Sequence, residues 1–261
     1  MEIALIGNGA IAQYAMHELA QRGHRIGALI LRPARLKETD APDGAKLISS
    51  ASELPKGIDH VLDCAGHSGL AAHGADILRS GTGLTTLSVG ALADPSLYDA
   101  LSKAAQEGSS KLQLVSGAIG ALDCLRAARI GQLRRVRYVG RKPPKGWMGS
   151  PAEEKLNLTK LEKPQVHFAG TARQAATLYP KNANVAAAVA LSGVGFDDTE
   201  VELIADPDVT SNIHEIHAEG DFGDLQFTVR GEALKSNPKS SALAAMSAVA
   251  AIEQLDSAFV F

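Results

Sequence analysis

The sequence predicts an α/β protein with two domains, a parallel sheet covered by helices on both faces and then a smaller α+β domain. Short apolar runs alternate with helical patterns through the first 120 residues. These runs are apolar at nearly every position, which is typical of strands buried on both faces of a parallel sheet. After Gly117 the strand candidates alternate polar with apolar residues, as half-exposed strands do.

The first domain is expected at residues 1–120, and its element boundaries carry recognisable signals. Asp94 and Pro95 suit the N-cap and the first position of a helix. Gly23 and Gly81 follow helical patterns that they can terminate. We predict strands at 2–6, 26–31, 60–64, 84–89 and 111–115 and helices at 11–21, 70–80 and 95–107.

The second domain is expected at residues 121–238, with catalytic and dimerisation roles. We predict helices at 121–130, 171–178 and 183–192, and strands at 136–139, 200–204, 212–218 and 225–229. The alternating strands and short connections favour a mixed or antiparallel sheet with one open face. Residues 141–164 are rich in proline, glycine and lysine and predict a mobile loop. An alanine-rich helix at 239–256 is expected to pack back on the first domain.

The composition of the chain argues against several classes of binding partner. The net charge of −3 gives no basic surface for nucleic acid or an anionic membrane. The chain begins directly with a strand and has no apolar run long enough to span a bilayer, so we expect a cytoplasmic protein. Cys64 and Cys124 match no zinc spacing and lie in apolar segments. We therefore expect no metal and two buried thiols.

A glycine-rich loop follows the first strand. Residues 7–12, GNGAIA, fit the pattern G-x-G-x-x-G/A between a strand and a helix, which is the context of the Rossmann dinucleotide-binding loop. Gly7 permits the tight turn, and Gly9 lets the backbone approach a pyrophosphate. Ala10 and Ile11 open the helix, whose N-terminus attracts phosphate. These four residues predict binding of NAD or NADP, although a glycine turn without a ligand is an alternative.

The end of the second strand bears on the choice between NAD and NADP. NAD-selective Rossmann enzymes usually carry an acidic residue there, which binds the ribose hydroxyls. This chain has Arg32 instead, with Arg35 three residues further on. A guanidinium suits a 2′-phosphate and can stack on adenine. We therefore expect Arg32 to contact the cofactor and NADP to be tolerated, and the alternative is a solvated surface arginine.

Two histidines lie on the predicted strand at 212–218. His214 and His217 are three residues apart, so on a strand they face opposite ways and do not form a metal site together. One histidine on the inner face can act as a proton shuttle, because its ordinary pKa lies near neutrality. From spacing alone, a purely structural role for His214 is the favoured interpretation.

Six segments together resemble the L-aspartate dehydrogenase family over nearly the whole chain. They are GNGAIA at 7–12, SGAIG at 116–120, YPKNANVA at 179–186, DP at 206–207, NIHE at 212–215 and NPKSS at 237–241. The resemblance implies a Rossmann domain with a small catalytic domain, and a homodimer is expected. It identifies His214 as the active-site histidine, and Ala118 and Asn184 as nucleotide contacts. A helix-capping role is the alternative for Asn184.

The reaction implied by the resemblance is the NAD(P)-dependent oxidative deamination of L-aspartate to iminosuccinate, which water converts to oxaloacetate and ammonia. In this family the product can feed NAD biosynthesis. A dicarboxylate needs cationic or N–H partners, and Lys239 and Ser240, expected at the start of the last helix, are the substrate candidates. Lys181 is a weaker substrate candidate. His67 follows a strand and could lie near the cofactor, although the family does not require histidine there, so a role outside the site is favoured. Trp147 is a candidate lid or dimer contact.

Two other functions stay open from the sequence. One is another NAD(P)H-dependent reductase of the same architecture, although the basic histidine-lysine motif expected of a dihydrodipicolinate reductase was not found. The other is a nucleotide-sensing protein without turnover, against which the joint presence of His214, Asn184 and Lys239 argues.

Overall fold

The computed structural model describes residues 1–42, 44–180 and 182–259, and for residues 238 and 239 it describes the backbone alone. The chain divides into two compact units. The first consists of Met1–Val115 together with Ala244–Phe261, and the second of Ser116–Leu243. Within the described residues no helix is long and apolar enough to cross a membrane.

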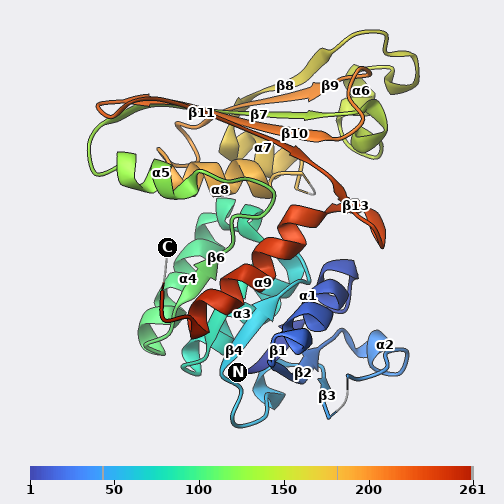
Figure 1. Cartoon of the computed structure of the whole chain (residues 1–261), viewed down its shortest axis with the longest axis vertical. Coiled ribbons are helices and arrows are strands. Elements are labelled where there is room, and N and C mark those ends of the chain that lie inside the picture. The colour runs from blue at the N-terminus through green and yellow to red at the C-terminus, as the bar shows by residue number, and fades with distance from the viewer. Residues whose placement is uncertain (43, 181, 260–261) are drawn as a thin grey trace. The chain divides into compact units, whose positions relative to one another are not determined.

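The first unit is built on a parallel sheet of six strands in the order β3-β2-β1-β4-β5-β6 (Figure 1). This order confirms the predicted Rossmann sheet. The strands are β1 (Glu2–Ile6), β2 (Arg25–Ile30), β3 (Lys46–Ile48), β4 (His60–Asp63), β5 (Gly83–Thr86) and β6 (Leu112–Leu114). The helices are α1 (Ala10–Gln21), α2 (Pro33–Leu36), α3 (His67–Arg79), α4 (Pro95–Glu107) and α9 (Ala242–Asp256), with 3-10 turns η1 (Ala51–Glu53) and η2 (Val89–Ala93).

Helices cover both faces of the sheet because the strand side chains that point to either face are mostly apolar. Ile3 and Leu5 of β1 are fully buried in a core shared with α1 and α9. On the opposite face α3 packs so closely that a Cβ on Gly74 would approach Leu84 of β5 and Leu101 of α4. Asp94 caps α4 by accepting a hydrogen bond from the Ser96 N–H at 2.9 Å, as the sequence predicted.

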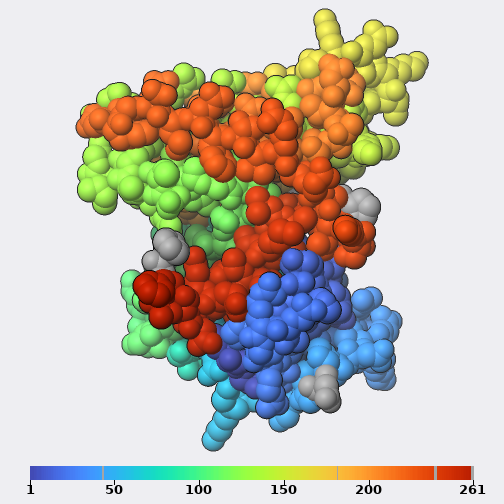
Figure 2. All heavy atoms as spheres, in the orientation of Figure 1, coloured from blue at the N-terminus to red at the C-terminus, as the bar shows by residue number. Residues whose placement is uncertain are grey.

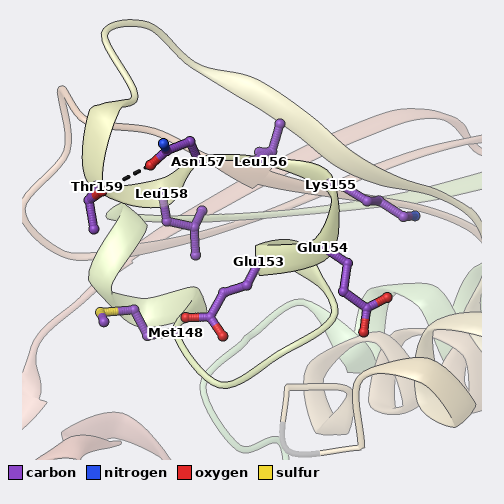
Figure 3. A pocket seen from close by; sticks show the side chains of 8 residues that line it. All are labelled: Met148, Glu153, Glu154, Lys155, Leu156, Asn157, Leu158 and Thr159. Atoms are coloured by element: carbon purple, nitrogen blue, oxygen red, sulfur yellow. Dashed lines mark hydrogen bonds between the residues drawn. The ribbon is translucent and has the colours of Figure 1, made fainter.

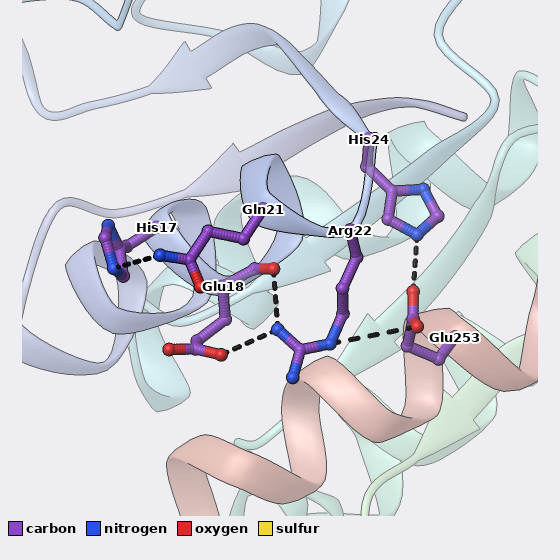
Figure 4. A network of polar contacts seen from close by, with 6 residues as sticks. All are labelled: His17, Glu18, Gln21, Arg22, His24 and Glu253. Carbon is purple, nitrogen blue, oxygen red and sulfur yellow. Dashed lines mark hydrogen bonds and ion pairs between the residues drawn. The ribbon is translucent and has the colours of Figure 1, made fainter.

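The C-terminal helix α9 lies against α1 in the first unit, as Figure 2 shows at the junction of the red and blue atoms. Its buried residues Ala248, Val249 and Ile252 extend the core. Glu253 adds polar contacts to the chain that follows α1, with His24 Nε2 at 2.6 Å and Arg22 Nε at 3.8 Å (Figure 4). Apolar packing and these contacts together hold the chain's C-terminal segment on the first unit.

The start of this helix differs from the prediction. It begins at Ala242, and the preceding residues Asn237–Ser241 form strand β13, which pairs with β12 (Ala233–Leu234). Pro238 disfavours helical backbone at Asn237, and the Asn237 amide donates instead to the Ser240 hydroxyl at 3.1 Å. The expectation that Lys239 and Ser240 open the helix is therefore wrong, because both lie in the strand.

The second unit contains a mixed sheet in the order β11-β10-β7-β9-β8, as predicted for this domain. Strand β7 pairs in parallel with β9, whereas the other pairs are antiparallel. The strands are β7 (Leu133–Lys142), β8 (Gln165–Thr171), β9 (Glu200–Ala205), β10 (Asn212–Gly220) and β11 (Gly223–Gly231). Helices α5 (Leu122–Ala128), α7 (Ala172–Leu178) and α8 (Asn184–Ser192) lie on one face, called here the covered face (Figure 1).

The segment 141–164 is loop-rich, as predicted, but it carries η3 (Pro144–Trp147), α6 (Ala152–Lys155) and η4 (Leu158–Lys160). Trp147 is 1% exposed, and its indole N–H donates to the Ile204 carbonyl at 2.9 Å. Its ring lies edge-on to His167, with centroids 4.3 Å apart. Trp147 is therefore part of the core of the second unit and not a lid or dimer contact. Its position between proline and glycine residues in the sequence gave no sign of this burial.

The two cysteines do not match the expected pair of buried thiols. Cys124 is exposed on α5, where Leu125 is the buried residue. Cys64 is partly buried just after β4, and burial together with the neighbouring Asp63 raises the pKa of its thiol. The expectation was therefore wrong for Cys124.

A buried histidine in the first unit makes stability depend on pH. His60 is 6% exposed, its Nε2 lies 2.8 Å from Thr85 Oγ1, and burial lowers its pKa to about 4. The unfolded chain therefore binds this proton more tightly, so stability is fully present above pH 6.5 and falls as the pH drops toward 4.

We expect wild type to lose about 2 kcal/mol more stability than His60→Gln between pH 7.5 and pH 5. Urea unfolding at the two pH values measures this difference, and glutamine is the control because it can keep a hydrogen bond but does not titrate. Equal losses in both proteins would contradict a buried, neutral His60.

Candidate functional site

A cavity of about 640 Å³ lies in the first unit at the carboxyl ends of β1, β2 and β4. Open parallel sheets bind ligands at this edge. The predicted cofactor residues Gly7, Gly9 and Arg32 line it, and Ala10 and Ile11 begin α1 directly after the glycine loop. The structure therefore gathers one part of the predicted site in a single cavity.

The glycine loop has the geometry that a dinucleotide needs. Gly7 has a φ of +94°, and a Cβ there would lie 3.0 Å from the Ala65 Cβ. A Cβ on Gly9 would meet no protein atom of the described residues within 4 Å, so its absence leaves space beside the backbone. Helix α1 begins without a side-chain cap and without an acidic residue in its first turn. Its N-terminal N–H groups can therefore hold the pyrophosphate of NAD(P).

A buried aspartate, which the sequence reasoning missed, holds in place the backbone of Ala65, a residue that lines this cavity. Asp63 Oδ2 accepts hydrogen bonds from Thr86 Oγ1 at 2.7 Å and Ser88 Oγ at 2.6 Å, and its Oδ1 accepts one from the Ala65 N–H at 2.9 Å. Burial raises the pKa of Asp63, although these bonds oppose the shift. An acidic residue ending an otherwise apolar strand is the sequence signal that could have identified it.

His214 lies on β10 in the second unit, on the covered face, and is 5% exposed. Its Nδ1 lies 2.7 Å from the hydroxyl of Tyr138, which is buried on β7. Gly140 is the residue opposite His214, and a Cβ at Gly140 would lie 2.8 Å from the Tyr138 hydroxyl. The glycine therefore leaves the room through which Tyr138 reaches the imidazole. A glycine inside a strand, two residues after a tyrosine, was the available signal.

The surroundings of His214 keep its imidazole neutral. Burial, and secondly the positive charge of Lys142, lower the pKa of His214 to about 3. The pKa of His214 therefore lies well below the ordinary histidine value on which the proton-shuttle interpretation was based. Burial also raises the pKa of Tyr138, so its hydroxyl stays protonated. His217 points to the opposite face, as predicted, with Nε2 3.5 Å from Glu215 Oε2.

The remaining predicted residues belong to different parts of the chain. Ala118 is buried in the turn after Gly117, whose φ is +68°. Asn184 is the exposed first residue of α8, and the N-cap is Ala183, so an N-capping role for Asn184 is not supported. Lys181 lies outside the described residues. His67 is the first residue of α3 in the first unit. It is among the weaker effects that oppose the rise that burial causes in the pKa of Asp63.

A second cavity, of about 450 Å³, is lined by Met148 and residues 153–159 of the second unit (Figure 3). Glu153 and Glu154 contribute carboxylates to its lining, while the Lys155 ammonium donates to the His167 carbonyl at 3.0 Å. Two carboxylates disfavour an anionic ligand, so this cavity suits neither a dinucleotide nor a dicarboxylate.

Comparison with known proteins matches both parts of the chain. The profile described as "Aspartate dehydrogenase, C-terminal" matches residues 123–255, and that described as "Homoserine dehydrogenase, NAD binding domain" matches residues 7–114. The chain is 52% identical to an L-aspartate dehydrogenase of Ruegeria pomeroyi, over 97% of this chain and 92% of that protein. It is 44% identical to an L-aspartate dehydrogenase of Pseudomonas aeruginosa, over 97% and 96%.

A solved structure covers the whole chain. The crystal structure of aspartate dehydrogenase from Thermotoga maritima superposes with a TM-score of 0.80 at 25% identity, over 100% of this chain and 99% of the other.

The position of Arg32 in the cavity beside the glycine loop leads to a prediction. This exposed arginine lines the cavity, and no described carboxylate pairs with it, whereas Arg35 has Glu38 at 3.4 Å. We expect Arg32→Ala to weaken NADPH binding about tenfold and NADH binding much less, because a charge-assisted contact to the 2′-phosphate is lost. Fluorescence titration measures both affinities, with Arg126→Ala on α5 as a control of equal charge. An equal effect on the two nucleotides would show that Arg32 does not bind the 2′-phosphate.

Proposed function

The chain belongs to the L-aspartate dehydrogenase family, and we propose that it oxidises L-aspartate with NAD(P), using His214 for proton transfer. The observation that supports this role of His214 is its geometry. It is a buried, neutral imidazole whose Nδ1 is engaged by Tyr138 on the covered face of the second sheet.

The reaction removes two electrons from the substrate. A hydride leaves Cα of L-aspartate, and bound NAD(P) supplies the nicotinamide that accepts it. The product is iminosuccinate, which water converts to oxaloacetate and ammonia, and the same steps run backwards in reductive amination. Protons must leave the amine and the attacking water, so the protein needs a group that can take them.

We assign cofactor binding mainly to residues 1–120 with the C-terminal helix, and the proton-transfer group to residues 121–238. Gly7, Gly9, Ala10 and Ile11 would hold the pyrophosphate, and the cavity with its uncapped helix terminus supports this. Ala118 and Asn184 are proposed as further nucleotide contacts. Lys239 and Ser240 remain proposed substrate contacts.

His214 can receive a proton at one ring nitrogen. Tyr138 occupies Nδ1, so Nε2 is the atom that we assign to the substrate amine or the attacking water. This assignment requires the tautomer in which Nδ1 carries the ring proton and donates it to the Tyr138 hydroxyl oxygen. A pKa of about 3 makes the imidazole a weak base before substrate binds. The two carboxylates of L-aspartate bring negative charge, which favours the imidazolium and raises this pKa. We infer that His214 becomes an effective base when the dicarboxylate is bound.

Assembly and cellular role are further parts of the proposal. We propose a homodimer that pairs the uncovered faces of the second sheet across a two-fold axis. That face carries complementary charges, including Arg135 with Glu200 at 2.7 Å and Arg137 with Glu202 at 2.5 Å. Sedimentation velocity distinguishes a dimer from a monomer. We also propose that the enzyme acts in the cytoplasm and that its iminosuccinate feeds NAD biosynthesis.

We expect His214→Ala to lower kcat about 100-fold or more while NADPH affinity is unchanged, because proton transfer is lost and the nucleotide loop is intact. Tyr138→Phe should lower kcat by a smaller factor, since it removes the hydroxyl that orients the imidazole. Steady-state kinetics with L-aspartate and nucleotide titration measure these effects, and Tyr98→Phe, at a half-exposed tyrosine of α4, is the control. Normal turnover by His214→Ala would exclude the proposed role.

A further inference from the structure

Lys142 ends strand β7 on the same face as His214. Side chains alternate along a strand, so Tyr138, Gly140 and Lys142 share the covered face. Gly140 lies directly opposite His214 in the register, which places Lys142 one step further along that face. The ammonium is close enough for its charge to lower the pKa of His214. Lys142 is therefore a cation beside the imidazole.

Two neutral neighbours hold the Lys142 side chain. Its Nζ donates a hydrogen bond to the Asn182 side-chain oxygen and lies 4.8 Å from the centroid of the Trp147 ring. An ammonium has three N–H donors, so capacity for a further acceptor remains beyond the Asn182 contact. The residue is half-buried, so part of its side chain remains in contact with solvent.

Lys142 differs from the arginines of the same strand, each of which has a carboxylate partner. Arg134 pairs with Asp221, Arg135 with Glu200, Arg137 with Glu202 and Arg141 with Asp206. In the described part of the chain no aspartate or glutamate forms an ion pair with Lys142. Burial without a counter-charge lowers the pKa of Lys142 to about 8. A bound anion would supply the missing charge.

We propose that the Lys142 ammonium binds a carboxylate of the substrate beside His214. This inference rests on the proposed function, because it takes the anion to be the dicarboxylate that the enzyme oxidises. An ammonium–carboxylate pair adds a charge-assisted hydrogen bond and favours amino acids that carry this group. It also offsets the Lys142 charge, which adds to burial in keeping the His214 imidazole unprotonated, so substrate binding makes His214 a stronger base.

The first test compares Lys142→Met with Lys145→Met, an exposed lysine three residues along the chain. We expect Lys142→Met to raise KM for L-aspartate about 10- to 100-fold, because a charged hydrogen bond is lost. Lys142→Arg should recover part of this loss, and NADPH affinity should be unchanged in all variants. Thermal unfolding confirms that each variant is folded. An unchanged KM in Lys142→Met overturns the proposal.

The second test needs no turnover, so it separates this proposal from the proposed function. Succinate carries two carboxylates and no reactive amine, and calorimetry in the presence of NADPH measures its binding. We expect Lys142→Met to weaken succinate binding at least tenfold and Lys145→Met to leave it unchanged. If L-alanine binding weakens as well, Lys142 holds the α-carboxylate, and if only succinate weakens, it holds the side-chain carboxylate. Wild-type succinate binding by Lys142→Met refutes the site.

Discussion

The hydrogen bond between Tyr138 and His214 is the interaction on which the catalytic half of the structure depends. It joins two residues that are buried on neighbouring strands, with the tyrosine hydroxyl 2.7 Å from the imidazole Nδ1. The bond requires Gly140, because a side chain there would meet the hydroxyl. Most buried polar atoms in proteins have a hydrogen-bond partner. Tyr138 is that partner at Nδ1 and leaves Nε2 for chemistry.

The two faces of the second sheet differ in whether their charged side chains are paired. On the uncovered face, cross-strand pairs such as Arg135 with Glu200 neutralise each other near water, where such pairs contribute little to stability. On the covered face, Lys142 has neutral neighbours and its positive charge reaches His214. A site with a cation and a neutral base suits an anionic substrate that must lose protons. In the first unit, the N-terminus of α1 has no side-chain cap, so its free N–H groups also favour an anionic ligand.

The sequence predicted most of the fold because its strands and helices are locally consistent. Helix α4 was placed correctly by Asp94 and Pro95, and the Rossmann order followed from buried apolar strands. The edge strand β3 and the strand β8 were missed, since three residues and an irregular register give little periodicity. Lys239 was misplaced because the alanine-rich helical pattern gives no sign that Asn237–Ser241 form a strand before it.

The site was less predictable than the fold. His214 was identified through a family resemblance, but its partner Tyr138 comes from a strand 76 residues away in the chain, and that pairing is a property of the tertiary structure. The same is true of its pKa. Burial dominates the shift, and the depth of burial follows from tertiary packing around β10 rather than from neighbours in the sequence.

The central claim is that Tyr138 and burial hold His214 as a neutral imidazole with one fixed tautomer. Long-range ¹H–¹⁵N correlation spectra of ¹⁵N-histidine-labelled protein report the charge and tautomer directly. With a pKa of about 3, the His214 signals should stay those of one neutral tautomer from about pH 8 down to about pH 5. A His214 resonance that titrates near the ordinary value of 6.5, or shows mixed tautomers, would contradict the account.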